Sequence, residues 1–133
     1  MLTRAGGALV AAGLLAWLAM RPTRVQVLGD SMSPALEAGD RAIALRPWWV
    51  RPGAIVVLVD PRLPARTLVK RALWLGSGGG GGGRRVVWVE GDNPGVSTDS
   101  RSFGLIPRRD LRGVLVWLYS PAARAGRVSG APG

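Results

Sequence analysis

Three short segments of this 133-residue chain carry the residue types that could perform chemistry. Ser31 lies in a predicted turn before a proline, and Lys70 is the only lysine among eighteen basic residues. The third segment, residues 91–101, holds a set of small, acidic and basic side chains: Gly91, Asp92, Asn93, Ser97, Asp99 and Arg101. A serine hydroxyl becomes a strong nucleophile when a nearby base removes its proton, and a neutral lysine amine can be that base. The residue types therefore allow serine–lysine chemistry.

The composition excludes most other mechanisms. The chain has no cysteine and no histidine, so it has no thiol nucleophile, no disulfide, no Ser-His-Asp triad and no Cys- or His-ligated metal. Any base must be a carboxylate, an amine or a bound cofactor, and arginine stays protonated. The sequence contains no recognisable site for a metal or an organic cofactor, so we expect none.

The strand pattern around Lys70 favours a buried amine. In an extended strand Leu68 and Lys70 share one face, while Val69 and Arg71 share the other. Apolar neighbours disfavour the charged form and lower the pKa of a lysine from its ordinary value of about 10.4. Each segment also has a simpler interpretation on its own: a turn serine, an edge-strand lysine, and a polar turn with an Asp99–Arg101 ion pair.

The order of the segments is more specific than any one of them. The chain contains, in sequence, Gly-Asp-Ser-Met-x-Pro (29–34), Pro-Gly-x-Ile-Val-Val (52–57), Val-Lys-Arg (69–71), Gly-Asp-Asn (91–93) and Ser-x-Asp-Ser-Arg (97–101). This order resembles the signal peptidase I family of membrane-bound serine–lysine proteases, over residues 25–121. Larger relatives insert an extra β-rich domain before Gly91, so the chain resembles a minimal member. The pattern Trp-Val-x-Gly-Asp-Asn-Pro at residues 88–94 also resembles that of a subgroup of short proteases proposed to mature nickel superoxide dismutase.

The resemblance implies a role for each candidate residue. Ser31 would be the nucleophile and Lys70 the general base, with the Ser97 hydroxyl orienting the amine. Asp99 and Arg101 would form a structural ion pair beside the site. The turn formed by Gly91, Asp92 and Asn93 would pack against the dyad, and Met32 would lie beneath the nucleophile.

The resemblance also implies how substrate is held. The Ser31 backbone N–H is the natural hydrogen-bond donor to the oxyanion. Many relatives have a second donor, a hydroxyl, at the position of Gly29, so the sequence does not identify a second donor in this chain. A substrate would add as a strand between the segment before Ser31 and the segment before Lys70. Small residues would be preferred just before the cleaved bond.

The pattern after residue 22 predicts a mainly β fold. Turn residues separate short apolar runs, which predict strands at 24–28, 41–45, 54–59, 67–75, 85–90 and 113–119. One helical turn is expected at 107–111. The resemblance implies a β-barrel core of the signal-peptidase and SOS-repressor type over residues 22–121. We expect a flexible glycine-rich hairpin loop at 76–83 and a disordered tail at 122–133.

The N-terminal residues 1–21 are expected to form a membrane anchor. Residues 5–20 carry no charge and are flanked by Arg4 and Arg21. Sixteen helical residues span about 24 Å, short of a hydrocarbon core of about 30 Å, so flanking arginines would have to snorkel. A cleaved signal peptide and a buried or interfacial helix are the alternatives. We expect a single-pass membrane protein with an extracytoplasmic catalytic domain. The charges on either side of the apolar run do not decide the orientation in the membrane.

The expected function is a serine endopeptidase that removes N-terminal signal peptides or propeptides after small residues, through an acyl-enzyme. Its partners would be preprotein substrates and the lipid bilayer. Alternatives are a nickel superoxide dismutase maturation protease, a self-cleaving protein like the SOS repressors, and a non-catalytic membrane-associated binding module. The net charge of +10 fits either an anionic neighbour, such as membrane lipid, or a solvated basic surface with scattered arginines. No nucleic-acid partner is expected, because no binding motif is recognisable.

Overall fold

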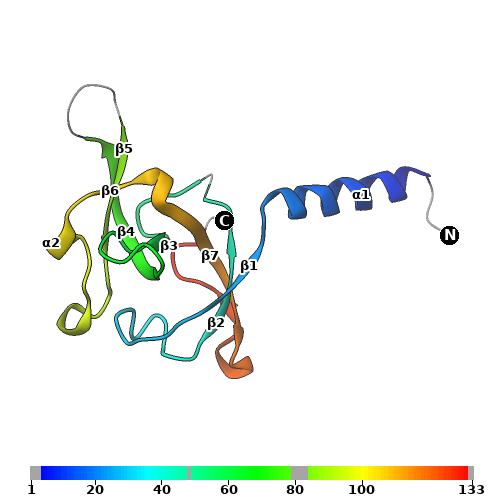
Figure 1. Ribbon diagram of the computed structural model, residues 1–133. Coiled ribbons are helices and arrows are strands. Elements are labelled where there is room, and N and C mark those ends of the chain that lie inside the picture. The colour runs from blue at the N-terminus through cyan, green and yellow to red at the C-terminus, as the bar shows by residue number, and fades with distance from the viewer. Residues whose placement is uncertain (1–3, 48, 79–83, 132–133) are drawn as a thin grey trace.

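The computed structural model describes residues 4–47, 49–78 and 84–131. Within them, eight strands form one antiparallel sheet with the path β1-β2-β7-β3-β4-β5-β6, and β8 pairs with β7 (Figure 1). The strands are β1 (Thr23–Gln26), β2 (Arg41–Leu45), β3 (Ile55–Val59), β4 (Thr67–Ser77), β5 (Arg85–Glu90), β6 (Ile106–Pro107), β7 (Leu111–Ser120) and β8 (Gly126–Arg127). The helices are α1 (Arg4–Ala19) and α2 (Ser100–Phe103), with 3-10 turns η1 (Pro94–Val96), η2 (Arg108–Asp110) and η3 (Ala122–Arg124).

The mainly β prediction is confirmed. The strands predicted at 41–45 and 85–90 have the predicted bounds, and the other four differ at their ends by one to a few residues. The expected helical turn is present as η2. The two-residue strands β6 and β8 and the helix α2 were not predicted, because such short elements leave no periodic pattern in the sequence.

The expected barrel closure is not seen. In the described part of the chain, β1 pairs only with β2 and β6 pairs only with β5, so the sheet has two free ends. The strands at these two ends are short: β1 has four residues and β6 has two. The structure is therefore an open antiparallel sheet rather than a closed barrel.

Strand β3 lies at the centre of the core. Its sequence IVVLV is apolar throughout, and both of its faces are buried. Ile55 and Val57 pack in one apolar cluster with Met32 and Leu115, while Val56 and Leu58 pack in a second cluster. A strand covered on both faces needs a continuous apolar run instead of alternation, and β3 has that run.

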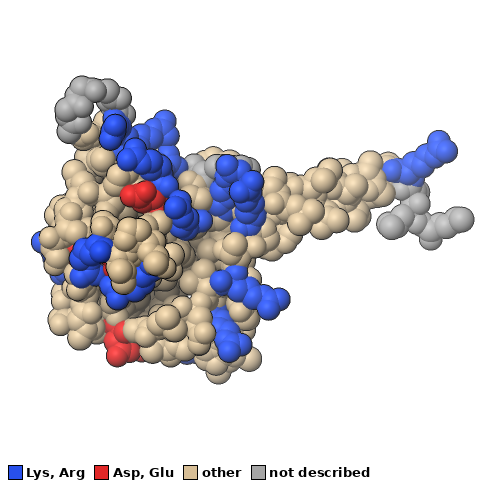
Figure 2. All heavy atoms as spheres, viewed as in Figure 1, with Lys and Arg blue, Asp and Glu red and all other residues tan. Residues whose placement is uncertain are grey.

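Helix α1 extends away from the sheet (Figure 1). Its large apolar side chains are exposed, including Leu9 at 76% and Leu15 at 67%. Figure 2 shows basic side chains over the sheet domain and at the N-terminal end of α1, with uncharged surface between them. Among the residues that the structure describes, no helix is long and apolar enough to cross a membrane, so the predicted transmembrane helix is not supported.

Residues 122–131, part of the segment 122–133 that was expected to be a disordered tail, lie against the sheet in the structure. Turn η3 is followed by β8, which pairs with β7, and Val128 is buried in the core. Arg124 also donates to Asp40 at 2.7 Å. The alanines, glycines and arginines of this segment resemble a linker in composition, but one apolar side chain and one ion pair hold it against the sheet. Of the predicted glycine-rich loop, 76–77 belong to β4, and 79–83 lie outside the described residues, as do 132–133.

Candidate active site

A groove of about 440 Å³ lies between the segment that leads into Ser31 and the first half of β4. Both walls present unpaired strand edges. Among the described residues, β1 pairs only with β2, and residues 67–70 of β4 pair only with β3, because pairing with β5 begins at Arg71. Ser31 and Lys70 both line the groove. The sheet thus brings together two residues that are 39 positions apart in the sequence.

Lys70 is almost completely buried, at 4% exposure. Its Nζ donates to the Ser97 Oγ at 3.1 Å. Burial lowers the pKa of the Lys70 amine, the negative charge of Asp99 opposes that effect, and the positive charges of Arg62, Arg101 and Arg66 add to it. The net direction is downward, which favours the neutral amine that a general base must be.

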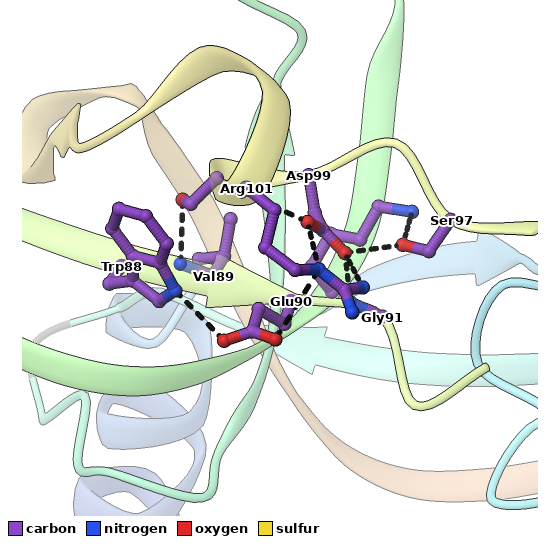
Figure 3. Close-up of polar contacts among 9 residues, drawn as sticks. Trp88, Val89, Glu90, Gly91, Ser97, Asp99 and Arg101 are labelled. Atoms are coloured by element: carbon purple, nitrogen blue, oxygen red, sulfur yellow. Dashed lines mark hydrogen bonds and ion pairs between the residues drawn. The ribbon is translucent and has the colours of Figure 1, made fainter. Parts of the chain in front are cut away.

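Asp99 is fully buried and is the centre of the polar network beside Lys70 (Figure 3). It accepts hydrogen bonds from the Gly91 backbone N–H at 2.8 Å, from the Ser97 hydroxyl at 2.7 Å and from the Arg101 side chain and backbone. Burial alone would raise the pKa of Asp99, but the bonds from Arg101, Gly91 and Ser97 prevail and hold it well below its usual range. Asp99 is therefore ionised and can only accept.

The direction of these bonds fixes how the amine is oriented. Because Asp99 can only accept, the single Ser97 hydroxyl proton is donated to Asp99. The Ser97 oxygen then accepts from Lys70. A neutral amine has two protons and one lone pair, so this bond uses one proton and leaves the lone pair available for another partner.

The loop that carries Asp99 also holds the loop that carries Ser31. The Asn93 backbone N–H donates to the Ser31 carbonyl at 2.9 Å, and the Asn93 side chain donates to the Asp30 carbonyl at 3.1 Å. Gly91 lies between the two: a Cβ added there would collide with the Ser97 Oγ and lie 2.6 Å from the Ser31 carbonyl oxygen. Glycine is therefore required at the closest approach of the two loops.

Ser31 itself is half-buried at the groove wall. Within the described part of the chain, no hydrogen bond joins the Ser31 hydroxyl to Lys70. In unliganded sites such bonds are often long and tighten only when substrate binds. Met32, directly after Ser31, is 1% exposed and packs in the core, so it anchors the turn below the groove.

Of the remaining predicted residues, Arg101 and Asp92 support the site from outside the groove, and Gly29 lies in its wall. Arg101 forms the expected ion pair with Asp99 and also lies 3.4 Å from Glu90. Asp92 makes a two-pronged pair with Arg71, at 2.8 and 2.7 Å, and so ties the 91–93 turn to β4. Gly29 lines the groove, and a Cβ added there would meet no atom within 4 Å. A hydroxyl-bearing side chain would fit at that position.

Sequence reasoning missed three charged residues at the groove. Arg62 and Arg66 line it, and the buried Asp60 binds both of them. In the sequence these residues form an ordinary charged turn, Asp-Pro-Arg-Leu-Pro-Ala-Arg, and no signal in that pattern places the two arginines beside Lys70. In residues 4–47, 49–78 and 84–131, no three acidic side chains gather in a way that could hold a metal ion.

Comparison with known proteins supports the protease resemblance. The chain is similar to mitochondrial inner membrane protease subunit 2. It is 37% identical to the mouse protein in an alignment 98 residues long, and the match covers 59% of this chain and 56% of the mouse protein. The human and bovine proteins are each 38% identical in alignments 98 residues long, and the matches cover 56% and 55% of their lengths. The chain thus spans about half the length of the curated relatives it matches.

These relatives favour the broad signal-peptidase-like group and give no support to the nickel superoxide dismutase subgroup. No protein-family model matches the sequence.

Proposed function

We propose that this protein is a serine endopeptidase of the signal peptidase I type, with Ser31 as nucleophile and Lys70 as general base. The observation that carries the proposal is the setting of Lys70. It is a buried amine with a lowered pKa, hydrogen-bonded to a Ser97–Asp99 pair, in the same groove as Ser31. A surface lysine on an edge strand would have none of these features.

The reaction would begin with proton transfer from the Ser31 hydroxyl to the lone pair of Lys70. The Ser31 oxygen attacks the substrate carbonyl carbon, and the Ser31 backbone N–H donates to the oxyanion that forms. The resulting Lys70 ammonium gives its proton to the leaving amine as the C–N bond breaks. Lys70, neutral again, takes a proton from the water that attacks the acyl-enzyme. It then gives that proton to the Ser31 oxygen as the ester bond breaks, which releases the new carboxyl end and restores the free enzyme.

The substrate would lie in the groove as an extended strand. The unpaired edges of β1 and of residues 67–70 both offer backbone N–H and C=O groups, which favour β-strand addition. The residues before the cleaved bond would occupy this groove, and the resemblance implies that small residues are preferred there. By analogy with the membrane proteases it resembles, the enzyme would act on preproteins that carry an N-terminal extension.

We also propose that α1 attaches the domain to a membrane. The relatives are named as inner membrane proteins, and α1 exposes its large apolar side chains along its length. Deletion of residues 1–21 should release the protein from the membrane fraction into the supernatant. Recovery of the shortened protein in the membrane fraction would contradict this role.

The catalytic proposal is tested with a panel of preproteins and propeptide-containing peptides. Wild type should cleave at least one of them, and Ser31→Ala and Lys70→Ala should each lose at least about a thousandfold in kcat/KM. Ser102→Ala, an exposed serine close to the Asp99 loop, is the matched control and should retain activity. Equal cleavage by Ser31→Ala and wild type would refute the assignment, and a folded wild type that cleaves nothing would favour a binding module.

A further inference from the structure

Two arginines lie at one end of the groove. Lys70 lines the groove farther along β4. Arg62 and Arg66 belong to the turn between β3 and β4, and both line the groove. Their side chains are 44% and 53% exposed. They are therefore accessible from the space where we propose that substrate binds.

Asp60 holds both arginines in fixed positions. It is fully buried and accepts from the Arg62 backbone and guanidinium, at 2.9 to 3.2 Å, and from the Arg66 guanidinium, at 2.6 and 3.1 Å. The Asp60 backbone N–H also donates to the Arg66 carbonyl, at 2.9 Å, which closes the turn. The guanidinium groups are thus ordered before any ligand arrives, which lowers the entropy cost of binding one.

The charges in this turn do not balance. One carboxylate faces two guanidinium groups, so the cluster formed by Asp60, Arg62 and Arg66 carries an excess positive charge. Asp60 uses the Nε and Nη2 groups of both arginines, and in the described part of the chain the Nη1 group of neither one has a hydrogen-bond partner. Asp30, the one acidic residue that lines the groove, belongs to the opposite wall, beside Ser31. The cluster therefore has both charge and donors to offer an anion.

We propose that Arg62 and Arg66 form a subsite that binds an acidic side chain of the substrate. Arg66 precedes Lys70 by four residues, which is about 13 Å along a strand at about 3.3 Å per residue. A substrate strand beside β4 has the same rise, so the acidic residue lies three to five positions from the cleaved bond. We place the acidic residue on the N-terminal side of the cleaved bond. This inference rests on the proposed function, in which the residues before the cleaved bond occupy the groove.

The competing explanation is that the ion pairs only stabilise the turn. In that case the arginines would be structural, and the charge of the substrate at this distance would not matter. Both arginines line the groove, and about half of each side chain is exposed to solvent. This exposure favours recognition, because two arginines that only stabilised the turn would not need to line the groove. A half-exposed charge pair is worth roughly 1 kcal/mol, which corresponds to a preference of about five- to tenfold.

The test uses a fluorescent decapeptide with Ala at the first and third positions before the cleaved bond and Gln elsewhere. Each variant peptide carries one replacement, either Glu or Lys, at one of positions two to six before the bond. Binding is measured by anisotropy with the Ser31→Ala protein, and cleavage is measured with wild type. We expect Glu to be preferred over Lys about tenfold at one position between three and five, in both assays.

The variants assign that preference to the cluster. Arg62→Gln and Arg66→Gln should each reduce it to threefold or less, while Arg66→Lys, which keeps the charge, should largely preserve it. Each single variant leaves one arginine on Asp60, so the turn keeps an ion pair. Arg85→Gln, an exposed arginine outside the groove, should leave the preference unchanged.

The outcomes separate this inference from the proposed function. Cleavage by wild type without a preference for Glu overturns the subsite and leaves the protease intact. A preference for Glu in binding without any cleavage supports the subsite and overturns the protease. A preference that survives both glutamine variants, or equal binding of all peptides, overturns the subsite.

Discussion

Two buried aspartates lie close to the groove, and they have different surroundings. Asp99 and Asp60 are both fully buried, and each accepts a set of hydrogen bonds from arginine. Asp99 faces one arginine and one hydroxyl, that of Ser97, which in turn accepts from Lys70. Asp60 faces two arginines and no hydroxyl.

The difference shows how one kind of buried group can serve two purposes. The negative charge of Asp99 raises the pKa of Lys70, whereas the positive charges of Arg62 and Arg66 lower it. The Asp99 cluster therefore orients the amine, and the Asp60 cluster leaves surplus positive charge in the groove. Loss of either carboxylate should weaken the fold, but only loss of Asp99 should disable the proposed catalysis.

Among the changes that test the difference between the two aspartates, Asp99→Asn should have the largest effect on activity. The variant removes the charge that holds Arg101 and disturbs the bond that orients Lys70, so kcat/KM should fall about a hundred- to a thousandfold. Asp60→Asn is the matched variant and should change kcat/KM by less than about fivefold. Both should lower the free energy of unfolding by about 2–3 kcal/mol, measured by urea denaturation. An equal loss of activity in the two variants would remove the distinction between them.

The second effect concerns Gly91, which lies between the Ser31 and Ser97 loops. Gly91→Ala introduces a Cβ where the Ser97 Oγ and the Ser31 carbonyl leave no room, so both loops must shift and kcat/KM should fall at least tenfold. Gly95→Ala is the control, since a Cβ at that position meets nothing within 4 Å. Peptide cleavage and thermal unfolding of the two variants test this point, and similar behaviour would contradict the described packing.

The third effect is a loss of stability in acid. The pKa of Asp60 is lowered from 3.8 to about 2, and that of Asp99 is also lowered. Both groups therefore stabilise the fold fully above about pH 4, and their contribution is lost as the pH falls through the folded-state pKa. The free energy of unfolding should drop between pH 4 and pH 2, and Asp60→Asn should flatten part of that slope. A wild-type stability that is constant over this range would contradict the ionised state of both carboxylates.

The smallest effect is electrostatic. Arg62→Gln or Arg66→Gln removes a positive charge that lowers the pKa of Lys70, so that pKa should rise. The rising limb of kcat/KM against pH should then move to higher pH, with a loss of a few-fold near neutral pH on an uncharged peptide. Arg85→Gln is the control and should not move the profile.

The sequence carried enough information to predict six of the eight strands in the described part of the chain, and the candidate residues. Long apolar runs such as 55–59 and the alternation around Lys70 are local patterns, and the structure contains both as strands. The motif order also singled out Ser31, Ser97, Asp99 and Arg101, and the last three lie in one network with Lys70. The catalytic roles themselves remain predictions.

The features that were missed depend on distant pairing. The position of Arg62 and Arg66 in the groove follows from the turn between β3 and β4, and the order of residues 122–131 follows from pairing with β7. The open sheet follows from the absence of pairing between β1 and β6 in the described part of the chain. None of these features has a local sequence pattern, because each depends on which segments the folded chain places side by side.

The central claim is that Lys70 is the neutral base of the reaction, and the composition allows it to be measured directly. Because Lys70 is the only lysine, labelling with ¹⁵N-lysine gives a single side-chain amine signal in an NMR pH titration. We predict that the pKa of this amine lies below its ordinary value of 10.5 and coincides with the midpoint of the rising limb of kcat/KM. A titration at or above 10.5, or activity whose midpoint does not follow the amine, would contradict the account.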